Sequence, residues 1–363
     1  MRFLKTRFSL LMGAALLGLS YAELGATRQK LAQTDINQRV STPPYRNQAP
    51  PQGREILPSS GIKQERQILP TDFRVGALQA DFTGDLWVGS WLGLARVNPN
   101  TGRLLARIGL PNYTIDALAQ DKVGRIWVGT YQGLLRVDPR INEVTAQNFT
   151  LPSNRVLSLL VDQRGYLWVG SDGGLSLISP DQGLLMTTLR ELPGVSANAL
   201  ALDEEGQLWV GTLEGIVKVD TASAFVIGRI SGAPVTTVQT LTFDKDGMLW
   251  AGTPNSLLVI DPETRQVVRS VTPMRGRNVS SISFSTDGSV WVGTDSGLFR
   301  LKADSGAVIG QIPSLPSNHI LSLSPDTGNK LWVGTTEGLA WVSMSSGRVR
   351  PHLAFVKDTP EDF

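Results

Sequence analysis

The 363-residue sequence contains no cysteine and only two histidines, His319 and His352. The lack of cysteine excludes disulfide bonds, thiolate zinc sites, a cysteine nucleophile and a lipid-modified bacterial N-terminus. Two histidines are too few for a multi-histidine metal site within one chain. An excess of charge of one sign is also missing, because 34 basic and 32 acidic residues give a formal net charge of +2. Such a chain lacks the electrostatic field that nucleic acid or an anionic membrane requires, so we expect neither as a partner.

Hydrophobic runs are short, and the one that stands out lies at the N-terminus. Residues 1–8 carry three cations, Ser9–Leu19 are mostly apolar, and Ser20-Tyr21-Ala22 places small residues at both positions of a cleavage site. This order is typical of a secretory signal peptide, and the apolar run is too short to cross a bilayer. We therefore predict a signal peptide over residues 1–22 and no membrane span in the mature protein. The predicted location is extracytoplasmic, namely the periplasm, a thylakoid lumen or the exterior.

Residues 23–60 are rich in proline, glutamine and asparagine, and the prolines are Pro43, Pro44, Pro50, Pro51 and Pro58. That composition cannot bury a core and favours extended, solvated backbone. We predict a disordered linker here, with a Pro-rich docking peptide as the alternative.

Tryptophan recurs at a nearly constant interval through the rest of the chain. The seven residues are Trp87, Trp127, Trp168, Trp209, Trp250, Trp291 and Trp332, 40 residues apart once and 41 apart thereafter. Each lies in a version of Asp-x-x-Gly-x-Leu-Trp-Val-Gly-Thr-x-x-Gly-Leu. A period near 40 without helical periodicity predicts one four-stranded sheet per repeat. Packing such sheets around an axis buries both faces of each, with the tryptophan as a wedge between neighbours.

The residue ten positions before each tryptophan indicates that the repeats close into a ring. All seven are small, as expected where seven strands converge on an axis: Ala77, Ala117, Ser158, Ala199, Thr240, Ser281 and Ser322. We predict an all-β fold, a seven-bladed β-propeller of four-stranded antiparallel blades over residues 61–355, with a C-terminal tail over 356–363.

The repeat motif resembles the two-component regulator propeller repeat over about residues 61–355. That resemblance implies a bacterial, extracytoplasmic propeller of the kind that forms sensor regions of hybrid histidine kinases. The 363 residues hold one propeller's worth of repeats and no kinase sequence. A sensing role would therefore involve a separate membrane partner.

The sequence contains two candidates for the outer strand of the seventh blade, one at each end of the propeller. Residues 61–70 align with residues 102–111, an outer strand and the Leu-Pro step that follows it. The last outer-strand candidate, Arg348–Phe355, contains Pro351, which weakens it as a strand. We hypothesise that residues 61–69 complete the seventh blade and tie the chain ends together.

Connections alternate between the two ends of an antiparallel sheet. The loops between second and third strands therefore share one face, here called the loop face, with the loops between blades. The Asp-x-x-Gly and Asn/Asp-Pro turns share the opposite one, the turn face. Thirteen residues before each tryptophan a polar residue precedes an apolar one, which predicts a polar ring around a channel mouth on the loop face. Its members are Arg74, Thr114, Arg155, Ser196, Thr237, Asn278 and His319.

From this face we predict the residues that bind a ligand or partner. They are Arg74, Trp91, Asp116, Tyr131, Arg155, Asn198, Gln239, Arg275, Arg277, Asn278 and His319. Arginines can hold a carboxylate or phosphate in a bidentate fork, and exposed aromatics beside mixed charges suit a glycan or a peptide. Arg275 and Arg277 form a basic step too small for nucleic acid. The alternative is that polar residues only mark where the loops meet solvent.

These features predict a non-catalytic binding or scaffold propeller that recognises a protein partner in the cell envelope, without cofactor or metal. The first alternative is a ligand sensor that acts with a two-component membrane partner. The second is an enzyme at the channel mouth, because streptogramin lyase is similar in fold and uses a histidine, a glutamate and magnesium. That resemblance implies His319 with Glu214 or Glu337, and Asp172 or Asp295 as oxygen ligands.

Overall fold

The computed structural model describes residues 72–110, 114–148, 150–179 and 181–356. These residues belong to one compact unit. The predicted signal peptide, linker and strand over 61–69 lie outside the described residues, as do residues 357–363 of the predicted tail.

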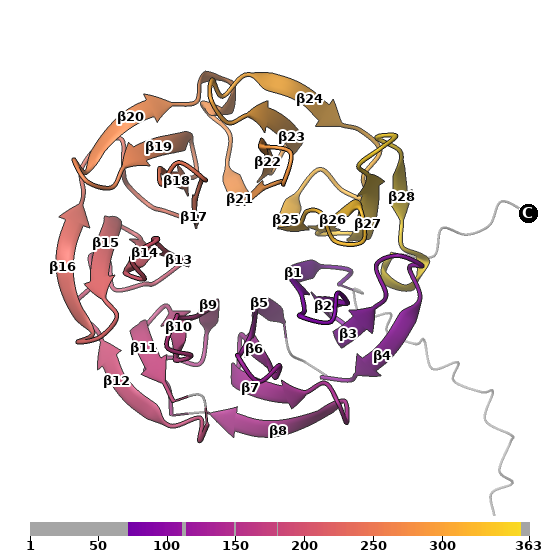
Figure 1. The fold of residues 1–363 in the computed structure, drawn as a ribbon, viewed down its shortest axis with the longest axis horizontal. Coiled ribbons are helices and arrows are strands. Elements are labelled where there is room, and N and C mark those ends of the chain that lie inside the picture. The colour runs from indigo at the N-terminus through magenta and orange to yellow at the C-terminus, as the bar shows by residue number, and fades with distance from the viewer. Residues whose placement is uncertain (1–71, 111–113, 149, 180, 357–363) are drawn as a thin grey trace, which may run out of the picture. The chain divides into compact units, whose positions relative to one another are not determined.

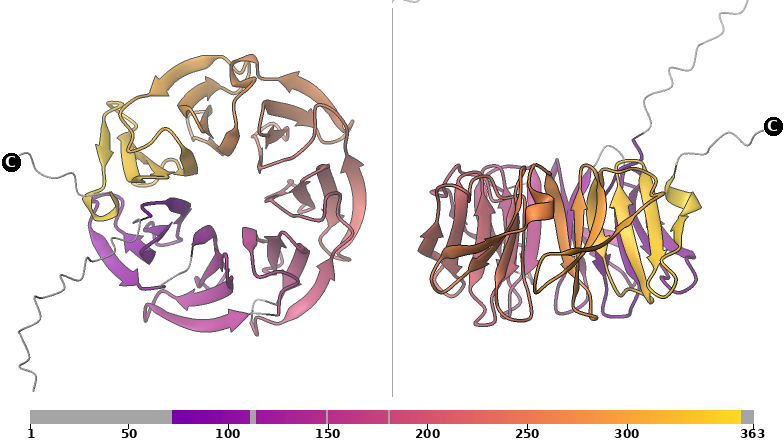
Figure 2. Two further views of the ribbon diagram at one scale, coloured as in Figure 1. Left: turned by 180° about the vertical axis from the view of Figure 1, so that it is seen from behind. Right: turned by 90° about the horizontal axis from the view of Figure 1, so that it is seen from above.

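The described chain forms seven four-stranded antiparallel sheets around a central axis, which confirms the predicted seven-bladed propeller (Figure 1). Each blade is one continuous stretch of chain, and its strands pair in sequence order from the innermost to the outermost. The side view in Figure 2 shows how the connections gather at the two ends of the strands. Two short 3-10 helices, η1 (Thr272–Met274) and η2 (Leu353–Phe355), complete the structure.

The first four blades comprise β1 (Val75–Ala80), β2 (Leu86–Ser90), β3 (Gly93–Val97), β4 (Leu104–Ile108); β5 (Ile115–Gln120), β6 (Ile126–Thr130), β7 (Gly133–Asp138), β8 (Glu143–Asn148); β9 (Val156–Val161), β10 (Leu167–Ser171), β11 (Gly174–Ile178), β12 (Leu185–Leu189); and β13 (Ala199–Leu202), β14 (Leu208–Thr212), β15 (Gly215–Asp220), β16 (Phe225–Ile230). The last three comprise β17 (Thr240–Phe243), β18 (Leu249–Gly252), β19 (Leu257–Asp261), β20 (Gln266–Ser270); β21 (Val279–Phe284), β22 (Ser289–Thr294), β23 (Gly297–Lys302), β24 (Val308–Ile312); and β25 (Ile320–Ser324), β26 (Lys330–Thr335), β27 (Gly338–Ser343), β28 (Val349–Pro351).

The hydrophobic core lies between the blades. Trp87 of blade 1 packs against Ile115, Ile126 and Val128 of blade 2, and the other repeat tryptophans pack in the same manner. All seven are at most 3% exposed. The tryptophans are therefore blade-to-blade wedges, as predicted.

Close packing at the hub explains why the inner strands carry small residues. The innermost strands contact one another around the ring, and β1 contacts β25 to close it. On β10, a Cβ added to Gly170 would overlap Ser158 Oγ and the carbonyl oxygen of Ala197 in the next blade. The second strand therefore admits only glycine where it passes the hub.

The Asp-x-x-Gly turn is tied to the tryptophan six residues after its aspartate. In blades 1 to 5 the indole Nε1 donates to that carboxylate over 2.8–3.2 Å. In blade 6 Ser285 stands in its place, and Trp291 Nε1 is buried without a hydrogen-bond partner among the described residues. In blade 7 Trp332 Nε1 donates to the carbonyl oxygen of Thr327 over 3.1 Å.

Blade 7 meets blade 1 through side-chain contacts. Ser322 Oγ donates to the Val75 carbonyl over 3.2 Å, and His352 Nε2 lies 2.7 Å from the carbonyl oxygen of Gly102. The outer strand of blade 7 is β28, in which Pro351 pairs with Ala340 of β27. The fourth strand thus comes from the C-terminal end of the propeller. Residues 61–69, assigned this role from the sequence, lie outside the described chain.

Candidate functional site

Backbone hydrogen bonds assemble the loop face. The N–H groups of Trp91 and Tyr131, in loops between second and third strands, donate to the carbonyl oxygens of Arg74 and Thr114 over 3.2 and 3.1 Å. Asp295 and Thr336 donate in the same way to Asn278 and His319, each over 3.2 Å. Members of the predicted polar ring therefore lie beside these loops, at the starts of the inner strands.

Blades 1 to 3 bring four predicted residues together. Asp116 lies at a β-bulge in β5, between Ile115 and Ala117. Burial raises the pKa of Asp116, while the charges of Arg74 and Arg155 act in the opposite direction. The Arg155 guanidinium lies 5.3 Å from the ring centre of Tyr131, whose side chain is 57% exposed. We call Arg74, Asp116, Tyr131 and Arg155 the arginine–tyrosine patch.

Trp91 borders this patch. Its ring packs edge-on against Phe73 with the ring centres 5.3 Å apart. Its Nε1 is buried without a hydrogen-bond partner in the described part of the chain. Arg74, next to Phe73, forms an exposed ion pair with Asp72 at 4.0 Å. The patch thus combines aromatic surface with charges of both signs.

Two predicted residues on blades 4 and 6 have contacts within the propeller. Asn198 Nδ2 donates to the Val238 carbonyl of the next blade over 3.0 Å. Arg277 Nη1 donates to Ser296 Oγ over 2.6 Å, and its guanidinium lies 4.6 Å from the ring centre of Phe299. These contacts hold both side chains against the blades.

The remaining predicted residues are not brought into the patch by any contact among the described residues. Gln239 Oε1 and Asn278 Oδ1 are buried and lack a hydrogen-bond partner there. Arg275, directly after η1, and His319 are exposed.

The residues implied by the lyase resemblance lie at loop positions. Asp172, Glu214, Asp295 and Glu337 are all exposed. Within the described ranges, no three histidine, aspartate or glutamate side chains gather into a cluster that could hold a metal ion. His319 is engaged through its backbone, which accepts from Thr336 and donates to Ser317 Oγ over 3.1 Å.

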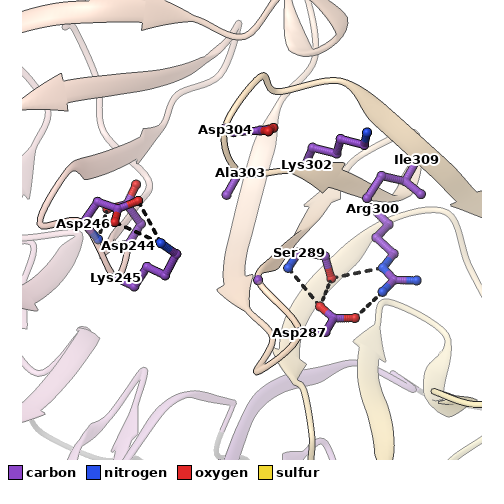
Figure 3. A pocket seen from close by; sticks show the side chains of 11 residues that line it. Asp244, Lys245, Asp246, Asp287, Ser289, Arg300, Lys302, Ala303, Asp304 and Ile309 are labelled. Atoms are coloured by element: carbon purple, nitrogen blue, oxygen red, sulfur yellow. Dashed lines mark hydrogen bonds and ion pairs between the residues drawn. The ribbon is translucent and has the colours of Figure 1, made fainter.

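The turn face carries hollows that the sequence analysis did not predict. One of about 440 Å³ lies between blades 5 and 6. Figure 3 shows Arg300 bonded to Asp287 and Ser289 on one side, with Lys245 paired with Asp246 on the other. The sequence signal for this arrangement is a cation nine residues after the repeat tryptophan, as at Arg300.

Comparison with known proteins agrees with the fold. The two-component regulator propeller family matches residues 109–132, 150–173, 191–214 and 314–337. No curated protein sequence matches significantly. The extracellular domain of a proposed one-component system from B. thetaiotaomicron is similar in structure, with 21% identity and a TM-score of 0.55 over 76% of this chain and 48% of that one. The chain thus spans about half the length of that structure.

A second similar structure is virginiamycin B lyase from Staphylococcus aureus. The identity is 15% and the TM-score 0.53, over 64% of this chain and 82% of that one. In the described part of the chain, no helix has the length and apolar character needed to cross a membrane. The described chain is a seven-bladed β-propeller, and four of its segments match the two-component regulator propeller repeat.

Proposed function

We propose that this protein is a non-catalytic, extracytoplasmic binding propeller that recognises a protein partner through the loop face of blades 1 to 3. The observation that supports this proposal is the arginine–tyrosine patch. Tyrosine and arginine are enriched among the residues that dominate protein–protein binding energies. Tyr131 is largely exposed, and Arg155 packs against its ring. An aromatic side chain held in this way loses little conformational entropy on binding.

The charges of the patch favour a partner of mixed polarity. Asp116 feels the charges of Arg74 and Arg155, so the patch offers both an acceptor and two guanidinium groups. Trp91 and Phe73 add apolar surface at its edge. Aromatic residues and arginine, which this surface combines, are both enriched in protein interfaces.

The patch is tested by capture of proteins from an envelope extract, with the full chain as bait. Tyr131→Ala is compared with Leu213→Ala, because each residue lies four positions after its repeat tryptophan in the equivalent loop. Leu213 is 45% exposed on blade 4 and serves as the matched control. We expect Tyr131→Ala to lose the protein that wild type captures, and Leu213→Ala to keep it. Equal capture by both variants would contradict the proposed surface.

The sensor alternative is supported by the structural likeness to an extracellular domain of a proposed one-component system. A captured protein from the membrane fraction that carries a cytoplasmic signalling domain would favour it over a scaffold. The proposed location is tested separately by fractionation of cells that express the tagged full chain. Mature protein that begins after Ala22 and lies outside the cytoplasm is the expected result.

A further inference from the structure

Blade 7 lacks a charge pattern that blades 1, 4 and 6 share on the turn face. In blades 1, 4 and 6 the residue nine positions after the tryptophan is a cation that lies 5.1–5.7 Å from the centre of that ring. Each cation pairs with a turn carboxylate, as Arg96 does with Asp85 at 2.8 Å and Lys218 with Asp203 at 2.9 Å. In blade 7 this position is Trp341.

A cation reaches Trp341 from the neighbouring strand. Lys330 Nζ lies 5.1 Å from the ring centre of Trp341 and donates to the backbone carbonyls of Pro99 and Asn100 in blade 1. Burial lowers the pKa of Lys330. The described contacts of the Lys330 ammonium group are thus with two backbone carbonyl oxygens and an aromatic ring, and none is with a carboxylate.

Blade 7 carries a hollow of about 550 Å³ around these residues, on the side where Lys330 reaches blade 1. Its lining is Gly328, Asn329, Lys330, Trp341, Ser343, Ser346, Arg348 and Arg350. Three of the eight residues are basic and none is acidic. Arg348 and Arg350 are exposed, and neither forms an ion pair within the described chain.

Two other hollows on the turn face are lined by both acidic and basic residues. The one in Figure 3 places Asp244, Asp246, Asp287 and Asp304 beside Lys245, Arg300 and Lys302. A hollow between blades 1 and 2 places Asp81 and Asp138 beside its cations. The hollow of blade 7 is therefore lined by cations without carboxylates. The turn aspartate of this blade, Asp326, accepts hydrogen bonds from Ser285 Oγ and the Thr286 N–H of blade 6.

We propose that this hollow of blade 7 binds a small ligand through an oxyanion, namely a carboxylate, sulfate or phosphate group. Arg348 and Arg350 provide guanidinium forks at its open side, and Lys330 is a fixed cation at its inner side. Ser343, Ser346 and Asn329 can donate or accept hydrogen bonds, while Trp341 supplies an apolar wall. A hollow of this volume lies in the range of small-molecule sites. The site is on the face opposite the arginine–tyrosine patch, so it does not depend on the proposed function.

The proposal is tested by calorimetric titration of the full chain at low ionic strength. The probes are sodium sulfate, sodium phosphate and sodium glucuronate, with uncharged glucose for comparison. Arg348→Ala and Arg350→Ala are the test variants. Arg229→Ala is the matched control, since Arg229 is an exposed arginine on β16 that does not line the hollow. Melting temperatures are recorded for every variant, and we expect them to stay close to wild type because all three side chains are exposed. The Arg350 guanidinium lies 5.7 Å from the ring centre of Trp341, a contact that contributes little at an exposed site.

We expect saturable binding of at least one anion and none of glucose. Arg348→Ala and Arg350→Ala should each weaken anion binding about tenfold or more, since each removes a charge-assisted contact, while Arg229→Ala should not. Binding of sulfate or phosphate alone would assign a tetrahedral oxyanion, and binding of glucuronate alone a sugar-borne carboxylate. No saturable binding of any anion, or equal affinity in both test variants and wild type, would overturn the proposal.

Discussion

The link between the Asp-x-x-Gly turn and the repeat tryptophan can be tested on blade 5. Asp244 accepts hydrogen bonds from Trp250 Nε1 over 2.8 Å and from the backbone N–H groups of Asp246 and Met248 over 3.0 and 2.9 Å. Asp244→Ala removes all three. Trp250 is fully buried, so its indole N–H would be left without a partner in the interblade core.

The loss in free energy of unfolding depends on how deeply each of the three hydrogen-bond donors is buried. An orphaned buried donor costs about 1–3 kcal/mol, and the two turn bonds near solvent contribute about 0.5–1.5 kcal/mol each. We expect Asp244→Ala to lower the free energy of unfolding by about 2–6 kcal/mol. The fold itself should persist, because Trp291 already lacks such a partner in blade 6.

The measurement is denaturant-induced unfolding, followed by tryptophan fluorescence and circular dichroism. Asp246→Ala is the control, since Asp246 is a carboxylate of the same turn with a side chain that is 70% exposed and pairs only with Lys245 among the described ion pairs. Its effect should stay below about 1 kcal/mol, as for other exposed pairs. Equal destabilisation by both variants would refute the role assigned to the buried indole bond.

Three further outcomes are expected. Gly170→Ala should prevent folding or lower the melting temperature strongly, because the new Cβ overlaps the next blade, whereas Gly310→Ala, with open space around it, should have little effect in the same thermal melts. Phe355→Ala should cost about 3–5 kcal/mol in denaturant unfolding, because this fully buried ring fills the core between blades 7 and 1. Burial would raise the pKa of Asp81, but hydrogen bonds from Thr83 and Trp87 outweigh it and lower the pKa below 3.8. The folded state therefore gains stability from Asp81 above about pH 4 and loses it as pH falls through the lowered pKa, and an Asp81→Asn variant should show a flatter acid-side stability curve.

The repeat spacing was sufficient to predict the fold, because each structural requirement recurs seven times. The tryptophan between blades, the small residue at the hub and the glycine of the second strand beside the hub each recur at an equivalent position in every blade. The outer strand of blade 7 was harder to assign, since Pro351 weakens a strand in general but pairs with Ala340 at this edge.

The candidate site depends on contacts between blades, which the spacing does not contain. Arg277 resembles a free basic residue in the sequence but packs on Phe299. Asn198 resembles a free polar residue but bonds to the backbone of the next blade. The pairing of Arg155 with Tyr131 joins residues of different repeats, and no periodic signal marks it. Hollows lined by residues of several repeats cannot be predicted from the spacing either, because they too depend on contacts between blades.

Each blade is built from one uninterrupted segment, with β25 to β28 forming the last as β1 to β4 form the first. Because no described blade combines strands from both ends of the chain, any of the seven blades could come first in the sequence. New termini cut into any connection between blades, with the old ones joined by a flexible peptide, should yield a circular permutant with the same architecture. Duplication or deletion of one repeat adds or removes a whole blade, so propellers of this kind can change their number of blades while every blade keeps four strands.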